Sequence, residues 1–151
     1  MKMDPNIRVK TDRRHQTLYN QLRNVAVGDS HELFFLCACL GYREKAPKAL
    51  GKNGDPRFWS GTISPEEWCC FYAMMLEESG MDFKAIQDDG KVMTRMEEYA
   101  NGGMEILIER VLGEYINSDE AQVSIDESAS KELPKLLLNH IFVEAFASSS
   151  R

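Results

Sequence analysis

The sequence has no long apolar stretch and no excess of positive charge. Its longest apolar runs, 33–40 and 68–76, span 8 and 9 residues, whereas a helix that crosses a membrane needs roughly 20. The first ten residues contain no apolar core of the kind that signal peptides carry. With 18 Lys and Arg against 24 Asp and Glu, the net charge is −6, which does not suit a general nucleic-acid coat protein. We therefore expect a cytoplasmic protein that does not contact a membrane.

Cysteine is scarce, and neither the cysteines nor the histidines have the spacing of metal ligands. The four cysteines lie inside the two apolar runs: Cys37, Cys39, Cys69 and Cys70. We expect reduced, buried thiols at these positions. Side chains one or two positions apart on a helix diverge, so neither pair can chelate one ion. The three histidines are scattered along the chain, and the sequence predicts no metal site.

The usual motifs of enzymes are also missing. There is no G-x-S-x-G nucleophile turn, and neither glycine-rich segment, 51–54 or 102–103, ends in the Gly-Lys-Ser/Thr of a phosphate loop. Adjacent carboxylates are common, but neighbouring residues on a helix do not face each other. We therefore expect no catalytic residue and no cofactor, and an unrecognised hydrolase ranks third among the functions considered.

The apolar residues of the sequence recur at helical spacing, which predicts an all-α or mostly α fold. A length of 151 residues suits one core, so we expect a single compact domain, 1–151, of five to six helices. The clearest helix start is the run 64–67, Ser-Pro-Glu-Glu, a capping box with proline at the first helical position. A central apolar helix is expected over 30–40, ended by Gly41 in the left-handed conformation, with a buried strand as the alternative.

Three segments lack this periodicity. Residues 1–10 are expected to form a flexible N-terminal arm, residues 42–62 a long irregular loop, and residues 117–132 an exposed acidic linker. After the linker, a C-terminal helix is expected over 133–146. Its Leu138 and Val143 fall outside the main apolar stripe, which indicates self-association or docking of a partner through this helix.

Charge is distributed unevenly along the chain. Residues 1–60 carry 11 Lys or Arg against 6 Asp or Glu, whereas residues 61–151 carry 7 against 18. The candidate basic edge comprises Arg8, Lys10, Arg13, Arg14, Arg43, Lys45 and Lys48. Such an edge can bind DNA weakly or dock an acidic protein partner, and solvated helix faces that differ in charge are the simplest alternative.

The most distinctive stretch is 97–107, Glu-Glu-Tyr-Ala-Asn-Gly-Gly-Met-Glu-Ile-Leu. Two adjacent glycines cost a helix about 2 kcal/mol relative to alanine, so we expect the helix to break there and two helices to meet at a tight angle. The candidate partner-docking residues of this stretch are Glu97, Glu98, Tyr99, Asn101, Gly102, Gly103 and Glu105.

The 97–107 stretch resembles the E-E-Y-A-N-G-G-[LM]-E-I-L signature of the Dnd system-associated protein 4 group, small proteins encoded beside DNA phosphorothioation genes. The apolar run 33–42, which ends in Leu-Gly-Tyr, is similar to a second segment of that group. The resemblance implies a non-enzymatic accessory subunit of phage defence that contacts other defence-system proteins. It assigns no catalytic residue. A small DNA-binding or regulatory module that uses the basic N-terminal half is the alternative.

Overall fold

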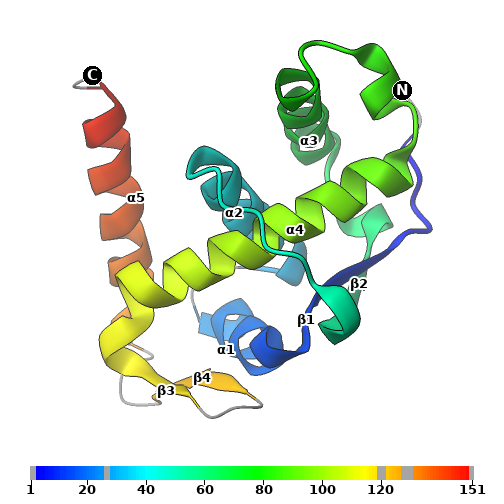
Figure 1. The fold of residues 1–151 in the computed structure, drawn as a ribbon. Helices are drawn as coiled ribbons and strands as arrows, with labels where there is room; N and C mark the ends of the chain where they lie inside the picture. The colour runs from blue at the N-terminus through cyan, green and yellow to red at the C-terminus, as the bar shows by residue number, and fades with distance from the viewer. Residues whose placement is uncertain (1–2, 26–27, 119–121, 127–130, 150–151) are drawn as a thin grey trace.

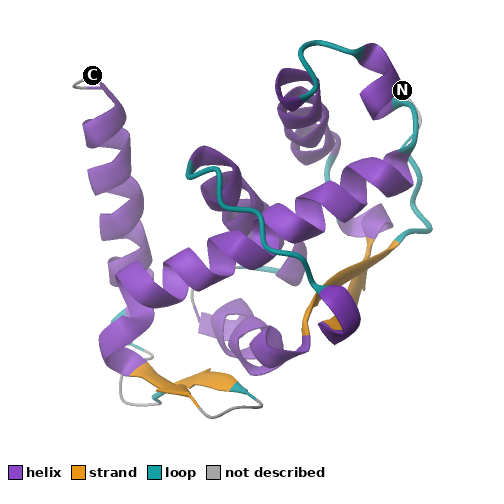
Figure 2. Ribbon diagram, viewed as in Figure 1, coloured by secondary structure: helices purple, strands orange, loops and turns teal. Residues whose placement is uncertain are grey.

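The computed structural model describes residues 3–25, 28–118, 122–126 and 131–149, and over these residues the protein is mostly helical (Figures 1 and 2). The α-helices are α1 (Gln16–Val25), α2 (Ser30–Arg43), α3 (Pro65–Glu78), α4 (Asp89–Leu107) and α5 (Leu133–Ser149). The strands are β1 (Arg8–Asp12), β2 (Gly54–Trp59), β3 (Ile116–Ser118) and β4 (Val123–Ile125). Among the described residues, no helix has the length and apolar character that crossing a membrane requires.

The long helix α4 runs through the middle of the molecule and packs against α2 (Figure 1). The prediction of a helix break at the paired glycines is wrong, because α4 continues through Gly102 and Gly103 without a positive φ. Gly41 likewise lies inside α2, which ends at Arg43, and is not a left-handed terminator. Tertiary packing, described below, outweighs the helix propensity of these glycines.

The N-terminal segment is not a free arm. Strand β1 pairs antiparallel with β2, so that Val9 faces Phe58 and is fully buried. Strand β2 and two 3-10 turns, 51–53 and 60–62, also replace much of the irregular loop expected over 42–62. Met1 and Lys2 lie outside the described residues. Over the described residues both predictions were wrong, because the sequences of β1 and β2, rich in charge and in Gly, Asp and Pro, do not indicate strands and the strands are held by pairing with each other.

The prediction for α3 is confirmed. Ser64 Oγ accepts a hydrogen bond from the Glu67 N–H at 3.1 Å, and the Ser64 N–H donates to Glu67 Oε1 at 2.9 Å. The helix ends at Ser79 and Gly80, where Gly80 has a φ of +72°. Its Phe71 ring lies 6.1 Å from Phe34 of α2, edge to face, so α2 and α3 meet in the core.

The expected acidic linker contains a β-hairpin. β3 pairs with β4, and Val123 and Ile125 point into the core. The Gln21 side chain of α1 accepts from the Ile125 N–H at 2.8 Å and donates to its carbonyl at 3.1 Å. Residues 119–121 and 127–130 of the linker lie outside the described part. The hairpin went unpredicted because it has only three residues in each strand.

The burial expected for the cysteines holds only in part. Cys37 is buried and Cys39 is half-buried, whereas Cys69 and Cys70 are exposed on the outer face of α3. All four are free thiols. An apolar run on a helix that lies at the edge of a core leaves one face outward, which explains the difference.

The C-terminal helix α5 stands at one side of the molecule and begins where predicted (Figure 1). Leu133 and Leu137 are buried, but Ile141, which follows them at the same four-residue spacing along the apolar stripe, is 47% exposed. Leu138 and Val143 are also exposed, as their positions off the stripe predicted.

Candidate functional site

The 97–107 stretch lies in the second half of α4, at the point where α4 crosses α2. A Cβ atom on Gly103 would overlap the Cys37 carbonyl oxygen and lie 2.6 Å from its carbon. From the other helix, a Cβ on Gly41 would overlap the Tyr99 carbonyl oxygen. The two backbones therefore touch, and only glycine fits on either side of the crossing.

Asn101 and Gly102 hold the segment that follows α2 against α4. The Asn101 amide donates to the Lys48 carbonyl at 3.1 Å, and the Lys48 N–H donates to the Glu98 carbonyl at 2.9 Å. A Cβ on Gly102 would overlap the carbonyl oxygen of Ala46. Asn101 Oδ1 is buried and has no hydrogen-bond partner among the described residues. These motif residues therefore fix the path of a loop.

Glu105 pairs with basic side chains from distant parts of the chain. Its Oε1 lies 2.6 Å from an Arg14 guanidinium nitrogen, 2.8 Å from His15 Nε2 and 3.6 Å from Lys48 Nζ. The hydrogen bond from His15 is the main cause of the lowered pKa of Glu105, about 2, and the charges of His15, Lys48 and Arg14 lower it further. Two cations of the predicted basic edge are therefore neutralised by a carboxylate of the motif.

Tyr99 belongs to a second polar cluster, between α3 and α4. Its hydroxyl donates to Glu78 Oε1 at 2.7 Å, and Arg95 pairs with both Glu78 and Glu98. The Tyr42 ring packs edge to face on Tyr99 with centroids 5.4 Å apart. The hydrogen bond from Arg95 is the main cause of the lowered pKa of Glu78, which keeps this carboxylate ionised.

Glu97 lies at a polar pocket of about 500 Å³ that Lys10, Lys52 and Thr94 also line. The side chain is only 9% exposed, and its Oε2 accepts from the Lys10 N–H at 2.7 Å. Lys10 lies opposite Pro56 of β2, which has no N–H, at an irregular point of the strand pair. Burial raises the pKa of Glu97 to about 7, against the opposing effect of Lys10.

The remaining predicted cations do not join one edge. The Arg8 guanidinium lies 4.9 Å from the ring centroid of the exposed Trp59. Lys45 Nζ lies 4.0 Å from the ring centroid of Tyr42 and 3.7 Å from Glu77. Arg13 and Arg43 are exposed. The structure therefore divides the seven cations among several environments, most of them beside aromatic rings or carboxylates.

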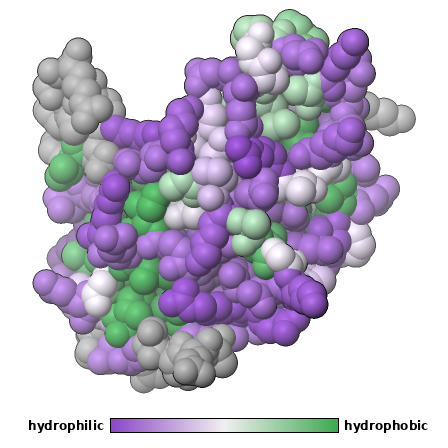
Figure 3. All heavy atoms as spheres, viewed as in Figure 1, coloured by the Kyte–Doolittle hydropathy of each residue, from purple (hydrophilic) through white to green (hydrophobic). Residues whose placement is uncertain are grey.

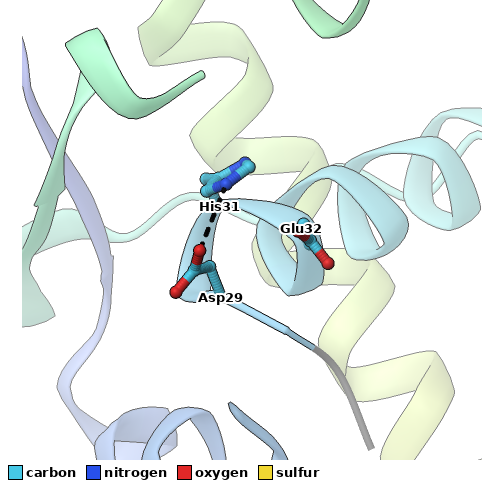
Figure 4. A group of neighbouring side chains, drawn as sticks. All are labelled: Asp29, His31 and Glu32. Carbon is cyan, nitrogen blue, oxygen red and sulfur yellow. Dashed lines mark ion pairs between the residues drawn. The ribbon is translucent and has the colours of Figure 1, made fainter. Parts of the chain in front are cut away.

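Asp29, His31 and Glu32 form a group that the sequence prediction missed, because it considered the histidines only by their mutual spacing. Their ligand atoms lie within 4.8 Å of one another at the start of α2, where Figure 4 shows Asp29 and His31 facing each other. His31 Nδ1 lies 3.0 Å from Glu67 Oε1 and its Nε2 lies 3.8 Å from Asp29. Asp29 and Glu32 are exposed, and the partial positive charge of a helix N-terminus opposes a cation. We assign no ion to this group.

An apolar groove of about 240 Å³ separates α5 from α2 and from the end of α4. It is lined by Leu36, Cys39, Leu40, Arg43, Leu107, Leu137, His140 and Ile141. A smaller hollow of about 170 Å³ lies beside the same helix and is lined in part by Val111, His140 and Val143. Figure 3 shows hydrophobic side chains gathered beside α5 and over the C-terminal end of α4.

No family model, curated protein or solved structure matches this chain. The class that the fold and the site define is a mostly α-helical domain with an apolar groove beside its last helix.

Proposed function

We propose that the chain is a cytoplasmic, non-enzymatic accessory subunit of a defence system linked to DNA phosphorothioation, and that it works through protein–protein contacts. One observation carries the proposal: among the described residues, three of the six exposed large hydrophobic side chains lie on α5, beside the apolar groove. Apolar patches of this kind are typical of protein interaction sites. The link to phosphorothioation rests on the resemblance of residues 97–107.

The contacts of the 97–107 stretch support a structural role for this motif. Asn101 holds a loop, Gly103 permits the helix crossing, and Glu105 pairs with Arg14, His15 and Lys48. These residues stabilise the scaffold that carries the groove. We therefore place the contact with other proteins at α5 and not at the 97–107 stretch.

Titration calorimetry of the purified chain against each protein encoded beside its gene tests this function. We expect at least one of these proteins to bind. Binding should weaken at least tenfold for Leu138→Glu and stay unchanged for Phe83→Glu, because both residues are exposed, at 68% and 62%, but only Leu138 lies on α5. The proposal is wrong if none of the encoded proteins binds the wild-type chain.

A small DNA-binding or regulatory module is the second candidate, and the exposed Arg8–Trp59 pair favours it. An arginine stacked on an exposed aromatic ring can bind nucleic-acid bases. Against it, Arg14 and Lys48 already pair with Glu105. We expect duplex DNA to bind no tighter than about micromolar at physiological salt, the non-specific range. Sub-nanomolar, sequence-selective binding in a gel shift would establish the DNA-binding candidate in place of the accessory subunit.

A further inference from the structure

A polar pocket lies where β1, the 3-10 turn 51–53 and α4 meet. Its volume is about 500 Å³, compared with about 240 Å³ for the groove beside α5, and small-molecule sites typically occupy about 300–1,000 Å³. In Figure 1 the segment after α2 crosses α4 before it reaches this turn. None of the lining residues belongs to α5, and those that carry polar or charged groups are Lys10, Lys52, Thr94, Glu97 and Glu98.

The 97–107 stretch forms two sides of this pocket. The Asn101 amide donates to the carbonyls of Lys48 and Ala49 at 3.1 and 3.4 Å, so the segment that leads into the turn is fixed to α4. In the turn itself, Gly51 has a φ of +58°, and a Cβ atom there would meet nothing within 4 Å. The same stretch therefore supplies the Glu97 carboxylate and anchors the wall opposite to it.

Glu97 is a buried carboxylate whose charge no described side chain neutralises. The residue is only 9% exposed, and its Oε2 accepts from the Lys10 N–H at 2.7 Å. Its Oε1 has no partner among the described residues. The described side-chain atoms that are both enclosed and unpartnered are Asn101 Oδ1 and His140 Nε2, so Glu97 Oε1 is open to the pocket that the residue lines. Buried charges in proteins are ordinarily paired, and a carboxylate like this one is typical of a binding site.

Two ammonium groups at the same pocket also lack a partner of opposite charge. Lys10 and Lys52 are exposed, and neither forms an ion pair with a described residue, whereas Lys45 and Lys48 do. A Cβ atom on Gly54, which also lines the pocket, would lie 3.5 Å from Lys10 Cδ, so the stem of Lys10 lies along this wall. The pocket therefore has a negative group in its buried part and positive groups in its exposed part.

This arrangement of charges selects among ligands. A divalent cation prefers several oxygen ligands, and here two lysines line the site of a single unpaired carboxylate. A simple anion would attract the lysines but would meet the charge of Glu97. Glu98 does not change this balance, because it pairs with Arg95 at 3.1 Å. A ligand that carries both charges matches both parts of the pocket.

We propose that this pocket binds a small zwitterion, whose protonated primary amine contacts the Glu97 carboxylate and whose own carboxylate lies beside Lys10 and Lys52. The amine offers three N–H donors, and Thr94 Oγ1, which donates to the Gly90 carbonyl at 2.9 Å, can accept one of them. This inference goes beyond the proposed function, because it assigns the chain a small-molecule ligand at a site separate from α5.

Amide NMR spectra of the isotope-labelled chain test the proposal with a series of amino acids of increasing length: glycine, 4-aminobutyrate and 6-aminohexanoate. Butylamine and butyrate are the controls that carry one charge each. With each probe added up to about 10 mM, a range that covers millimolar affinities, we expect at least one amino acid to shift the amides of residues 51–54 and 94–98 saturably. Both controls should bind at least tenfold more weakly than that amino acid.

Glu97→Gln and Lys52→Met should each weaken binding of that amino acid at least tenfold. Glu97→Gln keeps an acceptor for the Lys10 N–H, and Lys52 is exposed, so both variants should fold. Lys84→Met is the matched control, because Lys84 is also exposed and lies outside the pocket. The proposal is overturned if no amino acid shifts these amides, if butylamine or butyrate binds as tightly, or if Glu97→Gln binds like the wild type.

Discussion

At the scale of single residues, the paired glycines of α4 show how the low helix propensity of glycine led to a wrong prediction of backbone conformation. The prediction treated Gly102 and Gly103 as helix breakers, since glycine is a poor helix former. In the structure both are helical, and each touches the backbone of another segment, at Ala46 and Cys37. A single sequence does not reveal such close approaches, because the touching residues are distant in the chain.

Gly103→Ala tests whether the close approach matters. In a helix without tertiary contacts, this change stabilises by about 1 kcal/mol. Here the added methyl group would overlap the Cys37 carbonyl, so we expect a loss of about 1–3 kcal/mol from overpacking. Thermal or urea unfolding measures it. Gly113→Ala is the control, since its Cβ would meet only Ile108 O at 3.5 Å, and equal stability of both variants would contradict the packing account.

Glu105→Gln tests the cation cluster. The pKa of Glu105 is lowered from 4.5 to about 2, so the ionised form stabilises the fold at every pH above 4.5 and this contribution disappears as pH falls toward 2. We expect the variant to lose about 1.5–3 kcal/mol at pH 7 and to approach the wild type at low pH. A difference that does not change between pH 7 and pH 3 would show that the charge of Glu105 is unimportant.

Glu97→Gln should behave in the opposite sense. Burial raises the pKa of Glu97 from 4.5 to about 7, so the ionised carboxylate destabilises the fold increasingly as pH rises through this range. Gln keeps an oxygen for the Lys10 N–H. We expect the variant to match the wild type near pH 4 and to exceed it by about 1–3 kcal/mol at pH 8. Unfolding curves at both values decide, and a variant that is less stable at pH 8 would contradict the burial effect.

At the scale of elements, the cap of α3 was predicted correctly, whereas the pairings between distant segments were not. The start of α3 was predictable because Ser64, Pro65 and Glu67 form the cap among themselves. β1 and β2 were not, because each needs a partner some 45 residues away and neither has the composition of a strand: β1 is mostly charged, and β2 contains Gly, Asp and Pro. The groove beside α5 is likewise formed by helices far apart in sequence, although the exposure of Leu138 and Val143 followed from their position off the stripe.

The strand that replaces the predicted arm can be tested at two adjacent residues. Val9 is fully buried against β2 and α4, whereas Arg8 points outward. Val9→Asp should destabilise the protein by more than about 3 kcal/mol, because it buries an unpaired charge. Arg8→Asp should cost no more than about 1 kcal/mol. If both variants unfold at the wild-type urea concentration, residues 8–10 belong to the flexible arm, 1–10, that the sequence predicted.

At the scale of the whole molecule, the structure relates the charge asymmetry of the chain to internal contacts. Cations from the first 60 residues pair with carboxylates from the second part, as Arg14 and Lys48 do with Glu105 and Lys45 does with Glu77. Because of these pairs, fewer cations on the surface lack a carboxylate partner than the charge of residues 1–60 predicted. We therefore propose the apolar surface of α5, rather than a basic edge, as the surface that recognises another protein.

Protection against phage in the native host is the decisive measurement for the proposed role of α5 in defence. The gene is deleted and restored as wild type, as Leu138→Glu or as Phe83→Glu, and plaques are counted at equal expression of the three chains. We expect that deletion abolishes protection, that the wild type and Phe83→Glu restore it, and that Leu138→Glu does not, because only Leu138 belongs to the exposed apolar surface of α5. Full protection in the deletion strain, or full restoration by Leu138→Glu, would contradict it.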